Sequence, residues 1–274
     1  MTETPPALFD FAALDDLAFA ADRDRLGGRE LPRLKARDVG PVIELSQFAT
    51  KGLLPGPREA GWLELEGLDH LMRALDDGKT RWVCRDSGRM GFLRTGTAAP
   101  EDETVWTGFG LAAQKAATAA GFRKRIAAQL TAALGELHSN VYEHSGEPET
   151  GLIAFRAQAN RFEFVVADSG IGVLESLRSY DEYAGLCDYG EALRLALTDG
   201  VSRYGPAAGR GQGFRPLFIG LANLNGVLRF RSGDHALLID GQNPSLMTAR
   251  PAQKPRIPGF LVSVSCETIR RHAD

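Results

Sequence analysis

The sequence predicts an α+β fold, in which helical segments are followed by strands that pair antiparallel. Three observations lead to this fold class. Apolar residues recur at helical spacing up to Ser145, two strand patterns follow at 151–158 and 161–168, and a last strand pattern lies at 260–266. Because only Ala159 and Asn160 separate the two consecutive strands, we expect them to pair antiparallel.

The chain length and one polar segment predict two regions. A chain of 274 residues is long for one average domain and short for two large ones. Residues 98–106 are typical of a polar connector, and Ala and Leu become dense after them. We therefore expect an N-terminal partner or regulatory region of unknown fold at 1–105 and a main domain at 106–274.

Composition excludes several classes of protein. Hydrophobic residues at 43% and charged residues at 24% are typical of a globular chain. A net charge of -3 argues against a nucleic acid or membrane partner. The three cysteines are odd in number and widely separated, which argues against a disulfide framework or a thiolate zinc site. With no signal peptide and no run of roughly 18 apolar residues, we expect a cytoplasmic protein.

The N-terminal region is predicted to be small and mixed. An acidic amphipathic helix is expected over 7–26, and repeated Gly and Pro leave room for at most one short element, around 42–48. A short helix over 67–77 precedes a hairpin of 81–85 and 90–94.

The later part of the chain is predicted to hold a lid and further strands. Residues 173–208 are weakly patterned and are expected to form a mobile lid. A helix is expected over 214–225, followed by a hairpin of 227–232 and 235–240 turning at Gly233-Asp234. Four prolines within 242–258 predict a loop before the last strand.

The long helix ending near Ser145 carries a polar face. Glu136, Asn140 and His144 are one helical turn apart, at the edge of the apolar stripe. Magnesium prefers oxygen ligands that it shares with waters and phosphates, and Asn140 offers one such oxygen. Glu136, on the same face, is a candidate general base toward an attacking water or hydroxyl.

Two glycine-rich turns complete the pattern. Asp168-Ser-Gly-Ile-Gly172 closes an apolar strand: Gly170 and Gly172 let the backbone approach a base or sugar, and Asp168 can accept from an exocyclic amine, as in adenine. Gly209-Arg-Gly-Gln-Gly213 opens a helix whose N-terminus suits phosphates, with Gly211, Gly213 and Arg210 as candidate contacts. Each motif alone is more often structural, whereas their joint order predicts a nucleotide site.

With these motifs the chain resembles the GHKL superfamily of ATPases and kinases, which includes DNA gyrase, a large heat-shock chaperone, sensor histidine kinases and mismatch-repair ATPases. The resemblance covers roughly 110–268, with Glu136–Asn140 as N box, Asp168–Gly172 as G1 box and Gly209–Gly213 as G2 box. It implies a two-layer α/β sandwich, the Bergerat fold, that binds ATP with Mg. Before the last strand many relatives have Gly-Thr, where this chain has Gly259-Phe260.

The resemblance also implies a branch. Because the chain ends just after the last strand, it is closest to the histidine-kinase-like and anti-sigma-factor-like domains. No phosphoacceptor histidine motif precedes the unit. We therefore expect a regulatory ATPase or a serine/histidine-type protein kinase that acts on a protein partner. Whether the chain also forms a homodimer is left open. The rival reading is a nucleotide-gated interaction module with negligible turnover.

Overall fold

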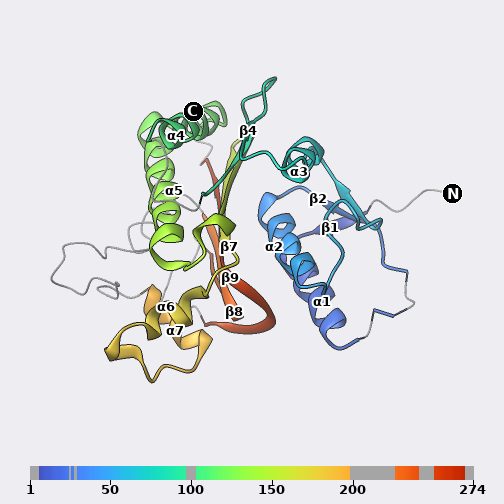
Figure 1. The fold of residues 1–274 in the computed structure, drawn as a ribbon. Coiled ribbons are helices and arrows are strands. Elements are labelled where there is room, and N and C mark those ends of the chain that lie inside the picture. Colours follow the sequence, from blue (N-terminus) through green and yellow to red (C-terminus); the bar gives the residue numbers. More distant parts are fainter. Residues whose placement is uncertain are drawn as a thin grey trace, which may run out of the picture.

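The computed structural model describes residues 6–24, 26–27, 30–96, 103–197, 226–240 and 250–268. These residues form mixed α and β structure, as the sequence predicts, with a three-stranded parallel sheet and a six-stranded antiparallel sheet (Figure 1). None of the described helices combines the length and apolar character that crossing a membrane requires.

The six-stranded sheet has the order β4-β5-β6-β7-β9-β8. Its first four strands are β4 (Arg81–Val83), β5 (Met90–Arg94), β6 (Leu152–Gln158) and β7 (Arg161–Asp168), and every neighbouring pair is antiparallel. Two of the three predicted hairpins, β4 with β5 and β6 with β7, are confirmed, and Asn160 turns the second one with φ +62°. Because β5 pairs with β6, residues 81–94 extend the sheet of the predicted main domain.

The last two strands correct two predictions. The hairpin over Gly233-Asp234 is wrong, because 227–240 form one strand, β8 (Val227–Asp240), in which Gly233 with φ +58° lies at a bulge. The loop predicted over 242–258 is wrong from 252 onward, because β9 runs from Ala252 to Glu267. The register between β8 and β9 shifts at Ser232/Gly233 and Gly233/His235, and such irregular pairing tolerates the missing N–H groups of prolines in β9.

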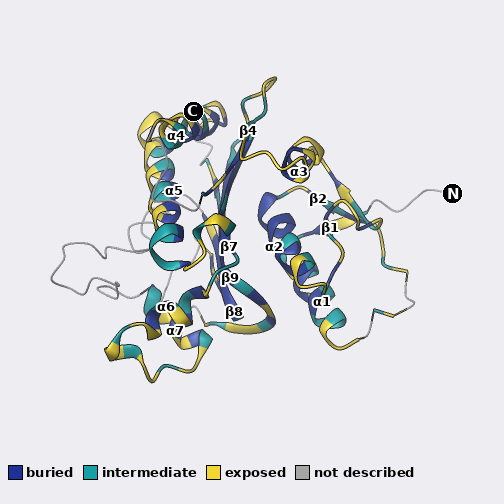
Figure 2. Cartoon of the chain, in the orientation of Figure 1, coloured by how far each residue is buried: buried dark blue, intermediate teal, exposed yellow. Residues whose placement is uncertain are grey.

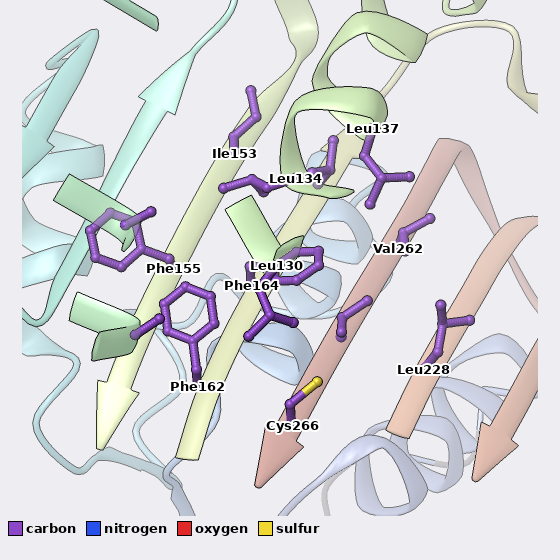
Figure 3. Close-up of a cluster of buried hydrophobic side chains, with 14 of the residues drawn as sticks. Leu130, Leu134, Leu137, Ile153, Phe155, Phe162, Phe164, Leu228, Val262 and Cys266 are labelled. Carbon is purple, nitrogen blue, oxygen red and sulfur yellow. The ribbon is translucent and has the colours of Figure 1, made fainter. Parts of the chain in front are cut away.

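Helices α4 (Glu103–Ala119) and α5 (Lys124–His144) cover one face of this sheet. The expected continuous helical pattern is interrupted near Gly121, whose φ is +104°. The apolar stripe predicted on α5 is confirmed, and its buried residues pack on aromatic residues of β6 and β7 (Figure 3). Each such leucine contributes about 1.5 to 3 kcal/mol by leaving water. The buried stripe consists of Leu130, Leu134, Leu137 and Val141, with Ile126 partly buried.

The N-terminal region covers the opposite face of the sheet (Figures 1 and 2). The predicted helix over 7–26 is shorter than expected, because β1 (Ala7–Phe9) precedes α1 (Phe11–Asp22) and Asp10 caps the helix by accepting from Ala13 N–H. The predicted short element around 42–48 belongs to a longer helix, α2 (Val39–Thr50), most of whose residues are buried.

The parallel sheet packs on the outer side of these helices and extends their core. It has the order β1-β2-β3, with β2 (Leu34–Ala36) and β3 (Leu63–Leu65), and α3 (Asp69–Asp76) confirms the helix predicted over 67–77. The six-stranded sheet is thus covered on both faces, where the resemblance implied helices on one. Whether the layer of α4 and α5 with the sheet is a Bergerat fold stays a prediction.

Buried charges join the N-terminal helices to the sheet. Arg229 donates to Asp15 at 2.6 Å and to Glu44 at 2.8 Å, and Arg231 Nε lies 3.1 Å from Glu44 Oε1. Burial alone would raise the pKa of Asp15, but Arg229 and Lys254 hold it below its usual value. Asp15 and Glu44 are therefore the buried counter-ions of β8.

The predicted lid is partly helical. The structure has α6 (Gly172–Arg178), a short 3-10 turn η2 (Asp181–Tyr183) and α7 (Tyr189–Ala196) in this segment. The Tyr189 ring packs against Gly233 of β8, so closely that a Cβ atom at 233 would lie 2.2 Å from it. Residues 198–225, with the rest of the lid and the helix predicted over 214–225, lie outside the described residues.

Candidate nucleotide site

Asp168 is the last residue of β7, and its side chain is on the face of the sheet that α5 covers. Phe162, Phe164 and Val166 of the same strand pack in the core beneath α5, and side chains alternate along a strand. Asp168 is only 1% exposed, and its Oδ1 accepts from Gly170 N–H at 2.9 Å. Its other oxygen, Oδ2, is buried without a hydrogen-bond partner in the described part of the chain.

The surroundings of Asp168 make its charge sensitive to pH near neutrality. Burial raises the pKa of its carboxyl to about 7, against the opposing effect of backbone N–H groups at Gly170 and Phe260, and the charge of Glu147 adds to the rise. Because Oδ1 is held by the Gly170 N–H, a proton on this carboxyl would sit on Oδ2. In the ionised form Oδ2 is an acceptor without a donor among the residues that the structure describes.

The turn after Asp168 is bonded to the C-terminal end of α5. Ile171 N–H donates to Ser145 O at 2.8 Å, and a Cβ atom at Gly170 would lie 2.0 Å from that same oxygen. Gly172 has φ +77°, a conformation that favours glycine. Both glycines of the predicted motif therefore have a structural reason, namely close approach at 170 and backbone conformation at 172.

The predicted polar face of α5 leads to this turn. Glu136 is exposed and Asn140 is half-buried, and the side chain of neither makes a hydrogen bond or ion pair with another described residue. Asn140 precedes Ser145 by five residues, about 7.5 Å along the helix axis. His144, on the same face, has its Nδ1 3.3 Å from Ser176 Oγ of α6. The structure thus brings the helix face and the Asp168 turn to one end of α5.

The donor atoms on this face fit magnesium in type. Asn140 and Glu136 offer hard oxygen ligands, and magnesium usually takes only one or two protein side chains beside waters and phosphates. Within the described ranges, no group of three or more His, Cys, Asp or Glu side chains could hold a metal ion by itself. A metal here would therefore depend on the phosphates that it accompanies.

The remaining predicted site residues belong to the second glycine-rich turn. Arg210, Gly211 and Gly213 lie outside the described residues, so the phosphate-binding prediction stays untested. His138, in the helical motif on α5, stacks on Trp106 with ring centroids 4.2 Å apart, and burial lowers its pKa to about 4. His138 is therefore a neutral core residue at physiological pH.

Gly259 and Phe260 occupy the two positions at which many GHKL proteins have Gly-Thr. Gly259 has φ +57°, and a Cβ atom there would lie 2.2 Å from Asp168 Oδ1, so only glycine fits. The Phe260 side chain is buried on the α5 side of the sheet. Sequence reasoning noticed this dipeptide as a departure but did not predict that Gly259 is needed for space beside Asp168.

Two nearby hydroxyls hold the turn in place. Ser232 Oγ donates to Gly259 O at 2.8 Å and accepts from Val173 N–H at 3.0 Å. Thr150 Oγ1 accepts from Ser169 N–H at 3.0 Å. Neither hydroxyl bonds to the Asp168 carboxyl, so neither replaces the threonine of the family pattern. Both residues were missed at the sequence level, because they become neighbours of the turn only in the folded sheet.

Comparison of the chain with protein-family models, with curated proteins and with solved structures gave no match. The resemblance to GHKL proteins therefore stays a prediction from the three sequence motifs.

Proposed function

We propose that this chain binds an adenine nucleotide with magnesium and acts as a GHKL-type regulatory ATPase or protein kinase on a protein partner in the cytoplasm. The observation that carries the proposal is the buried, unpartnered Oδ2 of Asp168 at the end of β7. A buried acceptor without a donor costs about 1 to 3 kcal/mol, and the exocyclic amine of adenine is a donor that would remove this cost.

The free side chains on α5 support the second half of the proposal. Asn140 would provide an oxygen to the magnesium that accompanies the phosphates, and Glu136 would accept a proton from the attacking water or hydroxyl. Neither side chain is engaged elsewhere in the described structure. Calorimetry with ATP and magnesium tests this proposal, and we expect saturable binding that weakens in Asn140→Ala.

A nucleotide-gated interaction module is the second candidate function. It is favoured by Phe260, which takes the place of a hydroxyl, and by the two nearby hydroxyls, which are already bonded to the turn. In this alternative, ATP or ADP would change the interface for a protein partner, or for a second copy of the chain, without turnover.

The variant Glu136→Ala separates the two functions. If Glu136 is the general base, its removal should lower hydrolysis or phosphotransfer by about 10² to 10⁴ while leaving ATP affinity within a few-fold. Equal background turnover in both proteins would reject catalysis and favour the interaction module. A parallel loss of affinity would show instead that Glu136 helps to bind the nucleotide or to hold the helix.

A further inference from the structure

Helix α2 reaches the end of β7 from the face of the sheet opposite to α5. Gln47 of this helix is 6% exposed, and its Nε2 donates to the carbonyl oxygens of Asp168 at 2.9 Å and of Phe260 at 3.2 Å. Asp168 and Phe260 are also the last register partners of β7 and β9 before the turn. One amide group therefore bonds to the end of β7 and to the neighbouring residue of β9, where the Asp168 carboxyl projects.

These two hydrogen bonds require an amide side chain at position 47. The other amide atom, Gln47 Oε1, is buried without a hydrogen-bond partner among the described residues. An apolar side chain at 47 would avoid the cost of that buried acceptor but would leave two backbone carbonyls without their donor. What glutamine adds at this position is thus its pair of hydrogen bonds to the end of β7 and to Phe260 within β9.

We infer that Gln47 is a positioning residue for Asp168, which fixes the base acceptor from behind the sheet. This inference rests on the proposed nucleotide function. Binding groups must be held within about 0.5 Å of their productive geometry. An amide that bonds both to the end of β7 and to the facing residue of β9 limits how far the two strands can separate there. Helix α2, in the N-terminal region, thereby becomes part of the architecture of the site.

A consequence concerns regulation. If Gln47 sets the geometry of Asp168, a protein partner that shifts α2 changes nucleotide affinity without touching the nucleotide. The N-terminal region and the nucleotide would then influence each other reciprocally.

The test compares two variants at the same interface. Gln47→Leu keeps a similar volume and removes the amide donor. The matched control is Arg161→Met, which breaks the 3.0 Å ion pair between Arg161 Nη1 and Asp38 Oδ1. Arg161 and Asp168 are the first and last residues of β7, about 23 Å apart along the strand. Both variants therefore loosen contacts between the N-terminal region and the sheet, but only one acts at the site.

Two measurements are made on the full chain. The first is the affinity for ATP with magnesium, which we expect to weaken about 5-fold to 30-fold in Gln47→Leu and to stay within about 2-fold in Arg161→Met. The second is the titration of the Asp168 carboxyl by ¹³C NMR in the free protein. In Gln47→Leu we expect its pKa to fall toward the ordinary value, because a loosened strand end admits water.

The carboxyl titration separates this inference from the proposed function. If the parent protein binds no nucleotide, the proposed function fails, and the titration still decides the role of Gln47. A titration and an affinity in Gln47→Leu equal to the parent's would overturn the inference, as would equal changes in Arg161→Met. If Gln47→Leu does not fold, Gln47→Asn keeps an amide with shorter reach and is held to the same expectations.

Discussion

The affinity for adenine nucleotides should depend steeply on pH, because the proposed base acceptor titrates near neutrality. The pKa of Asp168 in the free protein is raised to about 7, and its proton would sit on Oδ2, the atom that has to accept from adenine. The carboxyl is about 90% ionised at about pH 8 and about 10% ionised at about pH 6. The apparent Kd should therefore rise about 10-fold as the pH is lowered from about 8 to about 6. Calorimetric titration across this range measures the change.

Two controls isolate Asp168 in this experiment. Phosphate groups also titrate in this range, so adenosine is titrated in parallel with ATP. Burial and the nearby Asp38 raise the pKa of Glu163 to about 7 as well, but this residue lies on the opposite face, where its carboxylate accepts from Val39 and Gly40 N–H. We expect Glu163→Gln to keep the pH dependence of binding and Asp168→Asn to lose it together with most of the affinity. Affinity for adenosine that is independent of pH in the parent would refute the reasoning.

The same raised pKa predicts the sign of a stability change. An acid whose pKa is higher in the folded state stabilises the fold below its unfolded pKa, near 4, and this stabilisation is lost as pH rises through about 7. Asp168→Asn, which removes the buried charge, should therefore raise the unfolding temperature of the free protein at about pH 8. At about pH 3, below the unfolded pKa, Asp168 is neutral in both the folded and the unfolded state, so the difference between the two unfolding temperatures should be much smaller.

Two further substitutions, one of them with a matched control, test the packing around the site and between the layers. Gly259→Ala should lower both stability and nucleotide affinity, because it adds strain of about 1 to 2 kcal/mol and a clash with the Asp168 carboxyl. Gly78→Ala has the same strain at φ +69° in open space, so thermal unfolding should show a smaller loss and calorimetry an unchanged affinity. Arg229→Met should lower the free energy of unfolding by about 3 to 5 kcal/mol in urea titration, because it leaves two buried carboxylates of α1 and α2 underpaired. A loss below 1 kcal/mol would show that these charges are not coupled.

Local patterns predicted the parts of the fold that depend on neighbours in sequence. The α5 stripe, the pairing of β6 with β7 and the hairpin of β4 and β5 follow from apolar spacing and short turns. The errors arose where distant contacts decide the structure. Gly233-Asp234 has the composition of a turn, yet β9 pairs along both sides of it, and the long β9 strand includes Pro255 and Pro258.

The site shows the same division. Asp168 and its glycines were recognisable as a motif, because the turn itself imposes their spacing. Gln47 bonds to Asp168, which lies 121 residues away in sequence, and Ser232 bonds to Val173, which lies 59 residues away. No periodicity in the sequence links positions so far apart. The burial of Asp15 and Glu44 was hidden for a similar reason: their partner Arg229 is on β8, far along the chain, and acidic residues on helices are normally solvated.

The central claim is that Asp168 reads the base of a nucleotide, and base selectivity tests it most directly. ATP and GTP carry the same phosphates, but adenine offers an amine donor where guanine offers a carbonyl oxygen, which would face the unpaired Oδ2 of Asp168. In calorimetric titrations of the full chain with magnesium at about pH 8, we expect saturable ATP binding and GTP binding weaker by at least about 10-fold. Equal affinity for the two nucleotides, or no heat with ATP at millimolar concentration, would contradict the account.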